Sequence, residues 1–189
     1  MKSLGKKLFI VSLVAMLSMF FATGALADTK TNDVDVTIQA GEFSLATPSI
    51  KSFGNITLQS TPQTYKTSFD GKFTVKDLRG TQAGWRLDVE ASQFTNGDST
   101  LPVGSLSIEP ISNITRVGTG SGELPTVSMN SNQVIDDGKV EVARAKAGTG
   151  MGVFDITFPT DALSLVVDAT TAKVGTYEST LTWNLVLAP

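Results

Sequence analysis

The stretch over residues 177–187 limits the fold of this chain more than any other, because its apolar side chains recur at alternate positions. Successive side chains of a strand point to opposite faces, so alternation predicts a strand with one apolar and one mainly polar face. Aromatic and β-branched residues favour the same assignment. We therefore expect the stretch to be part of a sheet and to contribute to its core. The residues on the apolar parity are Tyr177, Leu181, Trp183, Leu185 and Leu187.

A second stretch, residues 84–90, repeats this pattern. Trp85, Leu87 and Val89 alternate with the charged residues Arg86 and Asp88, which again predicts a two-faced strand. Each stretch contains a Trp-x-Leu triplet, and the two triplets account for both tryptophans of the chain.

The paired triplets resemble the WxL domain of Gram-positive bacterial surface proteins. The distal motif of that family is matched by Tyr177, by Leu-Thr-Trp-Asn-Leu at residues 181–185 and by Pro189, and the proximal motif is matched by residues 79–87. The resemblance covers the whole chain after its first 27 residues. It implies a non-catalytic surface protein that attaches non-covalently to peptidoglycan and assembles with other surface proteins of a WxL complex. The binding residues that it implies are Trp85, Arg86, Leu87, Tyr177, Leu181, Trp183, Asn184 and Leu185.

The role of the tryptophans has two interpretations. Each shares a face with leucine, which favours burial, and an exposed stripe of Trp, Leu and Val would promote aggregation. The alternative is a platform for a sugar or a protein partner, because indole combines a flat apolar face with a polar N–H edge. We favour the core interpretation. A mixed outcome is the third alternative, in which the triplets pack together and shape the neighbouring surface while loops make the contacts.

The first 27 residues predict a secretory signal peptide. Lys2, Lys6 and Lys7 precede an apolar run over residues 8–22, and Ala-Leu-Ala at residues 25–27 forms a small-residue cleavage site. A retained membrane anchor is the alternative, but the run is short for a span. We therefore expect a WxL domain over residues 28–189 that is secreted, bound to the cell wall and not inserted in the membrane. The chain has no sorting motif of the Leu-Pro-x-Thr-Gly kind, which is consistent with non-covalent attachment.

Composition argues against several functions. The chain has a formal net charge of −3, and loss of the three signal-peptide lysines makes the exported part more acidic, so nucleic acid and anionic membranes are poor partners. The chain contains no His and no Cys, which excludes a Ser-His-Asp triad, a Cys nucleophile and a His/Cys zinc site. We predict no enzyme, metal or cofactor, although paired carboxylates for glycoside hydrolysis stay possible in principle. An adhesin for host matrix is a further alternative.

Short strands separated by turns predict an all-β protein. The favoured architecture is an antiparallel β-sandwich of the Ig-like or Greek-key type, and a closed β-barrel is the alternative. Residues 112–138 are the least regular and predict a long functional or mobile loop, whose contact with a membrane-anchored partner is a second route to wall retention. Phe154, after the glycine cluster at residues 148–152, is expected in the core. Further strands are predicted at residues 34–38, 56–59, 73–77, 106–108, 140–142, 154–158 and 163–167.

Overall fold

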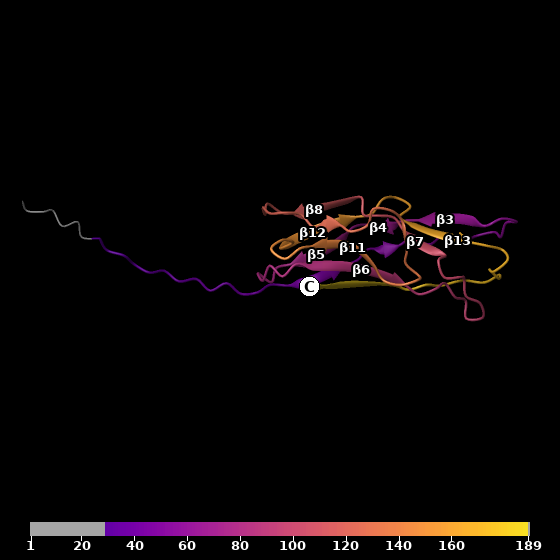
Figure 1. Ribbon diagram of the computed structural model, residues 1–189, viewed down its shortest axis with the longest axis horizontal. Helices are drawn as coiled ribbons and strands as arrows, with labels where there is room; N and C mark the ends of the chain where they lie inside the picture. The colour runs from indigo at the N-terminus through magenta and orange to yellow at the C-terminus, as the bar shows by residue number, and fades with distance from the viewer. Residues whose placement is uncertain (1–28, 189) are drawn as a thin grey trace, which may run out of the picture. The chain divides into compact units, whose positions relative to one another are not determined.

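A computed structural model describes residues 29–188, and every regular element in this range is a β-strand (Figure 1). The strands are short, as expected for a chain in which turn residues recur every few positions. They are β1 (Phe43–Ala46), β2 (Ser49–Ile50), β3 (Gln63–Thr67), β4 (Phe69–Asp70), β5 (Phe73–Asp77), β6 (Trp85–Ala91), β7 (Leu106–Ile108), β8 (Asn113–Val117), β9 (Thr126–Val127), β10 (Gln133–Val134), β11 (Val140–Ala145), β12 (Gly152–Thr157), β13 (Leu163–Val167) and β14 (Leu181–Leu187).

The described strands form three four-stranded sheets and one two-stranded pair. The sheet orders are β1-β5-β12-β8, β10-β7-β13-β3 and β14-β6-β11-β9, and β2 pairs with β4. Neighbouring strands pair in the antiparallel sense. Each four-stranded sheet has two outer strands, and none of the described sheets closes into a barrel. The predicted all-β sandwich is confirmed, and the barrel alternative is wrong.

Two of the sheets pack face to face. The ring centroids of Phe73 on β5 and Trp183 on β14 are 4.4 Å apart, and those of Trp85 on β6 and Phe154 on β12 are 6.3 Å apart. Phe154 is fully buried, as predicted. In Figure 1, β3, β7 and β13 gather at the end of the compact unit opposite to β5, β8 and β12. One core therefore lies between the sheet of β5 and β12 and the sheet that carries both triplets.

Two predicted strands are wrong. Residues 34–38 pair with no strand, and the side chains of Val34, Val36 and Ile38 are 97%, 84% and 87% exposed. Residues 56–59 form a loop instead of a strand. Alternation indicates that a segment can form a strand, but a strand also needs a hydrogen-bonding neighbour, which no local pattern supplies.

The predicted long loop is wrong in part, because residues 112–138 contain β8, β9 and β10. Their inward side chains are few: on β8 only Ile114 is buried, while Asn113, Thr115 and Val117 are exposed. Such polar strands on the outside of a sheet give little hydrophobic periodicity.

The chain divides into two units, Met1–Thr37 and Ile38–Pro189. The structure describes residues 29–37 of the first unit, and these contain no helix or strand. The predicted signal peptide lies outside the described residues. Within residues 29–188 no helix has the length and apolar character needed to cross a membrane.

Candidate functional site

The two triplets occupy neighbouring hydrogen-bonded strands. In the antiparallel pair of β14 and β6, Trp183 lies opposite Val89, Leu185 opposite Leu87 and Leu187 opposite Trp85. Residues opposite each other share a face, so the apolar residues of both triplets point to the same side of the sheet. The two tryptophans are offset by four residues along this pair. Trp85 belongs to the main core cluster, and Trp183 packs against it.

The proximal triplet is buried in the core and held there by a hydrogen bond. Trp85 and Leu87 are fully buried, and the Trp85 indole Nε1–H donates a hydrogen bond of 3.0 Å to the carbonyl oxygen of Gly150. Gly150 has a φ of +75°, and a Cβ there would collide with Ala145 and lie 2.9 Å from Trp85 Nε1. Only glycine allows this close approach without strain. The glycine cluster at residues 148–152 thus supplies the acceptor for the buried indole.

The residues before Trp85 hold the start of β6 in place. Arg79 donates two hydrogen bonds to the buried carboxylate of Asp77, from Nε to Oδ1 at 2.8 Å and from Nη2 to Oδ2 at 2.9 Å. This pairing raises the pKa of Arg79 above its ordinary value.

The Arg79 guanidinium also lies over the Phe43 ring, 3.8 Å from its centroid, and donates to the Gly84 carbonyl. Gly84 has a φ of +73° and faces the Ala145 carbonyl oxygen, which would lie 2.5 Å from an added Cβ. Arg79 and Gly84 therefore act as structural residues.

The distal triplet is more open. Trp183 is half-buried among phenylalanines, with ring-centroid distances of 4.4 Å to Phe73, 5.9 Å to Phe69 and 5.9 Å to Phe158. In the described chain its indole N–H donates to no protein acceptor, and no buried side-chain nitrogen lacks a partner, so this N–H reaches solvent. β14 is also an outer strand, with β6 as its single neighbour in the sheet. The distal motif thus combines core packing with an accessible edge.

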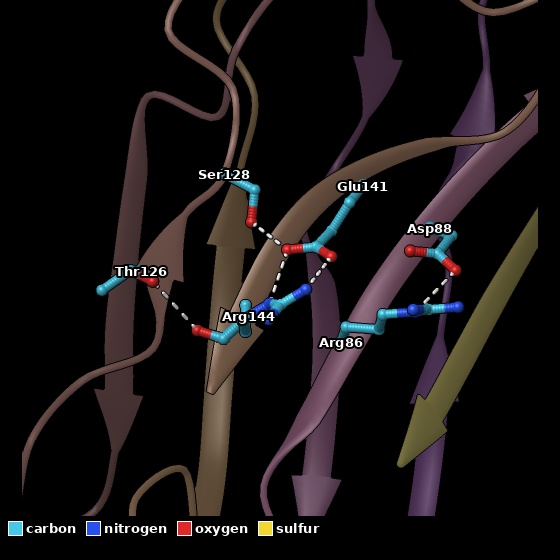
Figure 2. A network of polar contacts seen from close by, with 6 residues as sticks. All are labelled: Arg86, Asp88, Thr126, Ser128, Glu141 and Arg144. Carbon is cyan, nitrogen blue, oxygen red and sulfur yellow. Dashed lines mark hydrogen bonds and ion pairs between the residues drawn. The ribbon is translucent and has the colours of Figure 1, made fainter. Parts of the chain in front are cut away.

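The opposite face of the same sheet carries a polar network that includes Arg86 (Figure 2). Arg86 Nε donates to Asp88 Oδ2 at 3.1 Å, and Arg144 on β11 donates to both oxygens of Glu141 at 2.8 and 2.6 Å. The hydrogen bond from Arg144, together with a second one from Ser128, holds the pKa of Glu141 below its ordinary value of 4.5, although burial opposes this shift. Both arginines of this face therefore have an acidic partner.

A cleft of about 1020 Å³ opens beside the distal motif. One wall is the loop over residues 50–58, and the other is the segment over residues 172–181, which includes Tyr177 and Leu181. Its volume lies at the upper end of the ~300–1,000 Å³ that ligand pockets occupy. The apolar side chains that line it include Phe53, Phe94, Leu101, Leu106, Leu163, Leu165 and Val167.

Polar groups surround this apolar lining. The backbone N–H of Lys173 donates to the Tyr177 hydroxyl at 3.0 Å, which fixes the phenol at the cleft. The exposed Lys173 ammonium makes no ion pair within the described chain, whereas Lys51 pairs loosely with Asp70 at 3.7 Å. An apolar surface with a few hydroxyl and ammonium groups can bind an amphiphilic polymer. Among residues 29–188 no cluster of acidic side chains is suited to holding a metal ion.

The structure distributes the eight predicted site residues over three environments. Trp85, Leu87, Trp183 and Leu185 point toward the core, Arg86 and Asn184 point to the opposite face of the sheet, and Tyr177 and Leu181 line the cleft. Sequence reasoning missed the loop over residues 50–58, for which we find no signal in the sequence. It also missed Gly150, although the glycine cluster itself was visible.

Comparison with known proteins agrees with the motif analysis. A model of the family described as "WxL domain surface cell wall-binding" matches residues 25–189, which is nearly the whole chain. Searches of curated proteins and of solved structures gave no match. The family indicates a binding, non-enzymatic role at the cell surface, on the cell wall. With both triplets on paired strands of a β-sandwich, the chain belongs to the WxL domain surface cell wall-binding family.

Proposed function

We propose that this protein is exported, performs no catalysis and attaches non-covalently to Gram-positive peptidoglycan through the cleft beside the distal motif. One observation carries the proposal: two residues of that motif, Tyr177 and Leu181, line an open cleft of about 1020 Å³. Membership of a cell wall-binding family supports the coarser role.

The chemistry of the cleft suits this polymer. Peptidoglycan consists of amino-sugar chains, whose rings and acetyl groups have apolar faces, and of short peptides that carry carboxylates. Phe53, Leu58 and Leu181 keep part of their surface exposed and can pack against the apolar faces. Tyr177 and neighbouring backbone groups can bond hydroxyl and amide groups. The Lys173 ammonium can bind a peptide carboxylate. In this proposal the triplet residues Trp85, Leu87, Trp183 and Leu185 hold the strands that shape the cleft.

A sedimentation assay on purified peptidoglycan tests the proposal, with insoluble cellulose as the control. The unmodified chain should sediment with peptidoglycan and not with cellulose. Lys173→Glu should weaken retention about tenfold, which corresponds to one charge-assisted contact. Lys146→Glu is the matched control, because Lys146 is also an exposed loop lysine without an ion pair among the described residues. Equal retention of the unmodified chain on both polymers would disprove specificity for the wall. Equal losses of retention in both variants would exclude the cleft as the binding site.

Salt separates cleft binding from adsorption by charge. About 1 M salt shortens the Debye length to about 3 Å and removes long-range attraction between exposed charges. An acidic protein held mainly by apolar contacts and hydrogen bonds should stay on the wall under these conditions. A steep loss of retention with salt would indicate charge-driven adsorption instead.

A second candidate role is a protein–protein interaction subunit that reaches the wall through other surface proteins of a WxL complex. The observation that favours it is the outer position of β14 and β8 in their sheets, since an outer strand can accept a strand from a partner. Deletion of the partner genes should then release the protein into the medium, whereas direct peptidoglycan binding predicts that it stays on the wall.

A further inference from the structure

The two walls of the cleft carry backbone groups that the rest of the described chain does not use. On one wall residues 53–58 make no backbone–backbone hydrogen bond to another described segment, and on the other wall residues 174–177 make none. None joins the two walls to each other. Unpaired N–H and C=O groups can bind an extended peptide by the main-chain hydrogen bonds that add a strand to a sheet edge.

Both walls are held in place by the sandwich. Thr67 Oγ1 on β3 donates to the Lys51 carbonyl at 2.7 Å, which fixes the start of the loop over residues 50–58. On the other wall, the backbone of Glu178 exchanges two hydrogen bonds of 2.9 Å with the backbone of Thr95. Walls that are already ordered lose less freedom when a ligand binds.

The side chains of the cleft suit small apolar groups better than stacked sugar rings. Leu58 on one wall is 39% exposed, and Val174 on the other is 94% exposed. The aromatic residues that line the cleft, Phe53, Phe94 and Tyr177, are half-buried. Phe53 and Phe94 pack edge to face with each other, with ring centroids 6.0 Å apart. No ring of the cleft therefore presents a fully open face to a sugar.

The cleft also offers one unpaired charge of each sign. Lys173 and Glu178 are exposed, and neither makes an ion pair among the described residues. Lys51, which also lines the cleft, pairs with Asp70. A ligand that carries both a carboxylate and an ammonium group complements Lys173 and Glu178, whereas a neutral sugar chain uses neither charge.

We propose that the cleft binds the peptide part of the wall polymer and not its sugar chain. An extended oligopeptide lies between the walls, its backbone bonds their free N–H and C=O groups, and its small side chains contact Leu58 and Val174. Its terminal carboxylate pairs with Lys173, and a cationic side chain pairs with Glu178. This assignment rests on the proposed attachment to peptidoglycan through this cleft.

Beads that carry a synthetic peptide test the assignment, because dense coupling makes weak binding measurable. The peptide Ala-isoGln-Lys-Ala is coupled through its N-terminus, which leaves one carboxylate and one ammonium group. The unmodified chain should sediment with these beads and with peptidoglycan, but not with chitin, an insoluble amino-sugar polymer without peptides. Methylation of the backbone nitrogens of the peptide should weaken retention about tenfold, because it removes hydrogen-bond donors.

Charge variants test the two ends of the peptide separately. The unmodified chain should prefer the free carboxylate over a C-terminal amide about threefold, and Lys173→Glu should abolish this preference while Lys146→Glu keeps it. Glu178→Gln should abolish a similar preference for lysine over the uncharged norleucine in the peptide. Glu123→Gln is the matched control, because Glu123 is an exposed loop residue outside the cleft.

Three results would overturn the assignment. Equal retention on chitin and on peptidoglycan, with none on the peptide beads, would identify the sugar chain as the ligand and leave the attachment to peptidoglycan intact. Retention on the beads that N-methylation and both cleft variants leave unchanged would show that the peptide binds elsewhere. A chain that sediments with none of the three materials would contradict the proposed function as well.

Discussion

The same Trp-x-Leu triplet occurs twice in this protein, in two different environments. The proximal triplet lies on β6, which has sheet neighbours on both sides, and its Trp85 is fully buried with its indole N–H bonded to Gly150. The distal triplet lies on β14, an outer strand, and its Trp183 is half-buried with its indole N–H open to solvent.

This difference shows that a repeated motif need not repeat a role. The two triplets share a face and a core, so both stabilise the fold. Only the distal motif extends to the cleft and to a free strand edge, so interactions with other molecules are expected there. The following predictions test this asymmetry, from the largest expected effect to the smallest.

Trp85→Ala should lower the free energy of unfolding by about 3–5 kcal/mol, since it removes a fully buried indole and leaves a cavity. That is a large part of the ~5–15 kcal/mol that stabilises a typical domain. Denaturant unfolding measures the change. A loss below about 1 kcal/mol would contradict the central position of the proximal triplet.

Gly150→Ala should destabilise the protein by about 2–4 kcal/mol, because the new Cβ combines backbone strain with a collision against Ala145. Gly148→Ala is the matched control: its φ is +86°, but nothing lies within 4 Å of the added Cβ. The difference between the two unfolding free energies isolates the close packing of Gly150 against Ala145 and Trp85. Equal effects would mean that this packing is unimportant.

Trp183→Ala should cost about 1–3 kcal/mol, less than Trp85→Ala, because its ring is only partly removed from solvent. Chemical denaturation of the two variants side by side gives the ranking. A larger loss for Trp183→Ala than for Trp85→Ala would reverse the proposed asymmetry.

Glu141→Gln should destabilise the protein by only about 0.5–1 kcal/mol at neutral pH, since the partner Arg144 is 41% exposed and solvent screens the pair. The folded-state pKa of Glu141 is lowered, so its stabilisation is complete above the ordinary value of 4.5 and is lost as the pH falls through the lower folded value. The melting temperatures of the unmodified chain and of Glu141→Gln should therefore become equal as the pH falls below 4.5. A difference that persists in strong acid would rule out the ion pair as its cause.

Much of the fold could be predicted from the sequence, because the inner strands contain dense alternation. β5, β6, β12 and β13 each bury side chains at every second position, which is the signal that periodicity detects. β3 and β9 show few buried apolar residues, and pairing between distant strands depends on tertiary contacts that no local pattern encodes.

The candidate site was less predictable for a similar reason. The hydrogen bond from Trp85 to Gly150 joins residues 65 positions apart, and the cleft is enclosed by two loops without periodic sequence. For residues 34–38 the prediction failed in the opposite direction, because their alternation is clear but the structure has no strand there.

Quenching of single-tryptophan variants tests the asymmetry of the two triplets most directly. The chain has two tryptophans, so Trp183→Phe reports on Trp85 alone and Trp85→Phe reports on Trp183 alone. The emission of Trp85 should resist the quencher acrylamide, whereas Trp183 should be quenched several-fold more efficiently. Equal quenching of both indoles in folded protein, or stronger quenching of Trp85, would contradict the conclusion that Trp85 is buried while Trp183 is partly open to solvent.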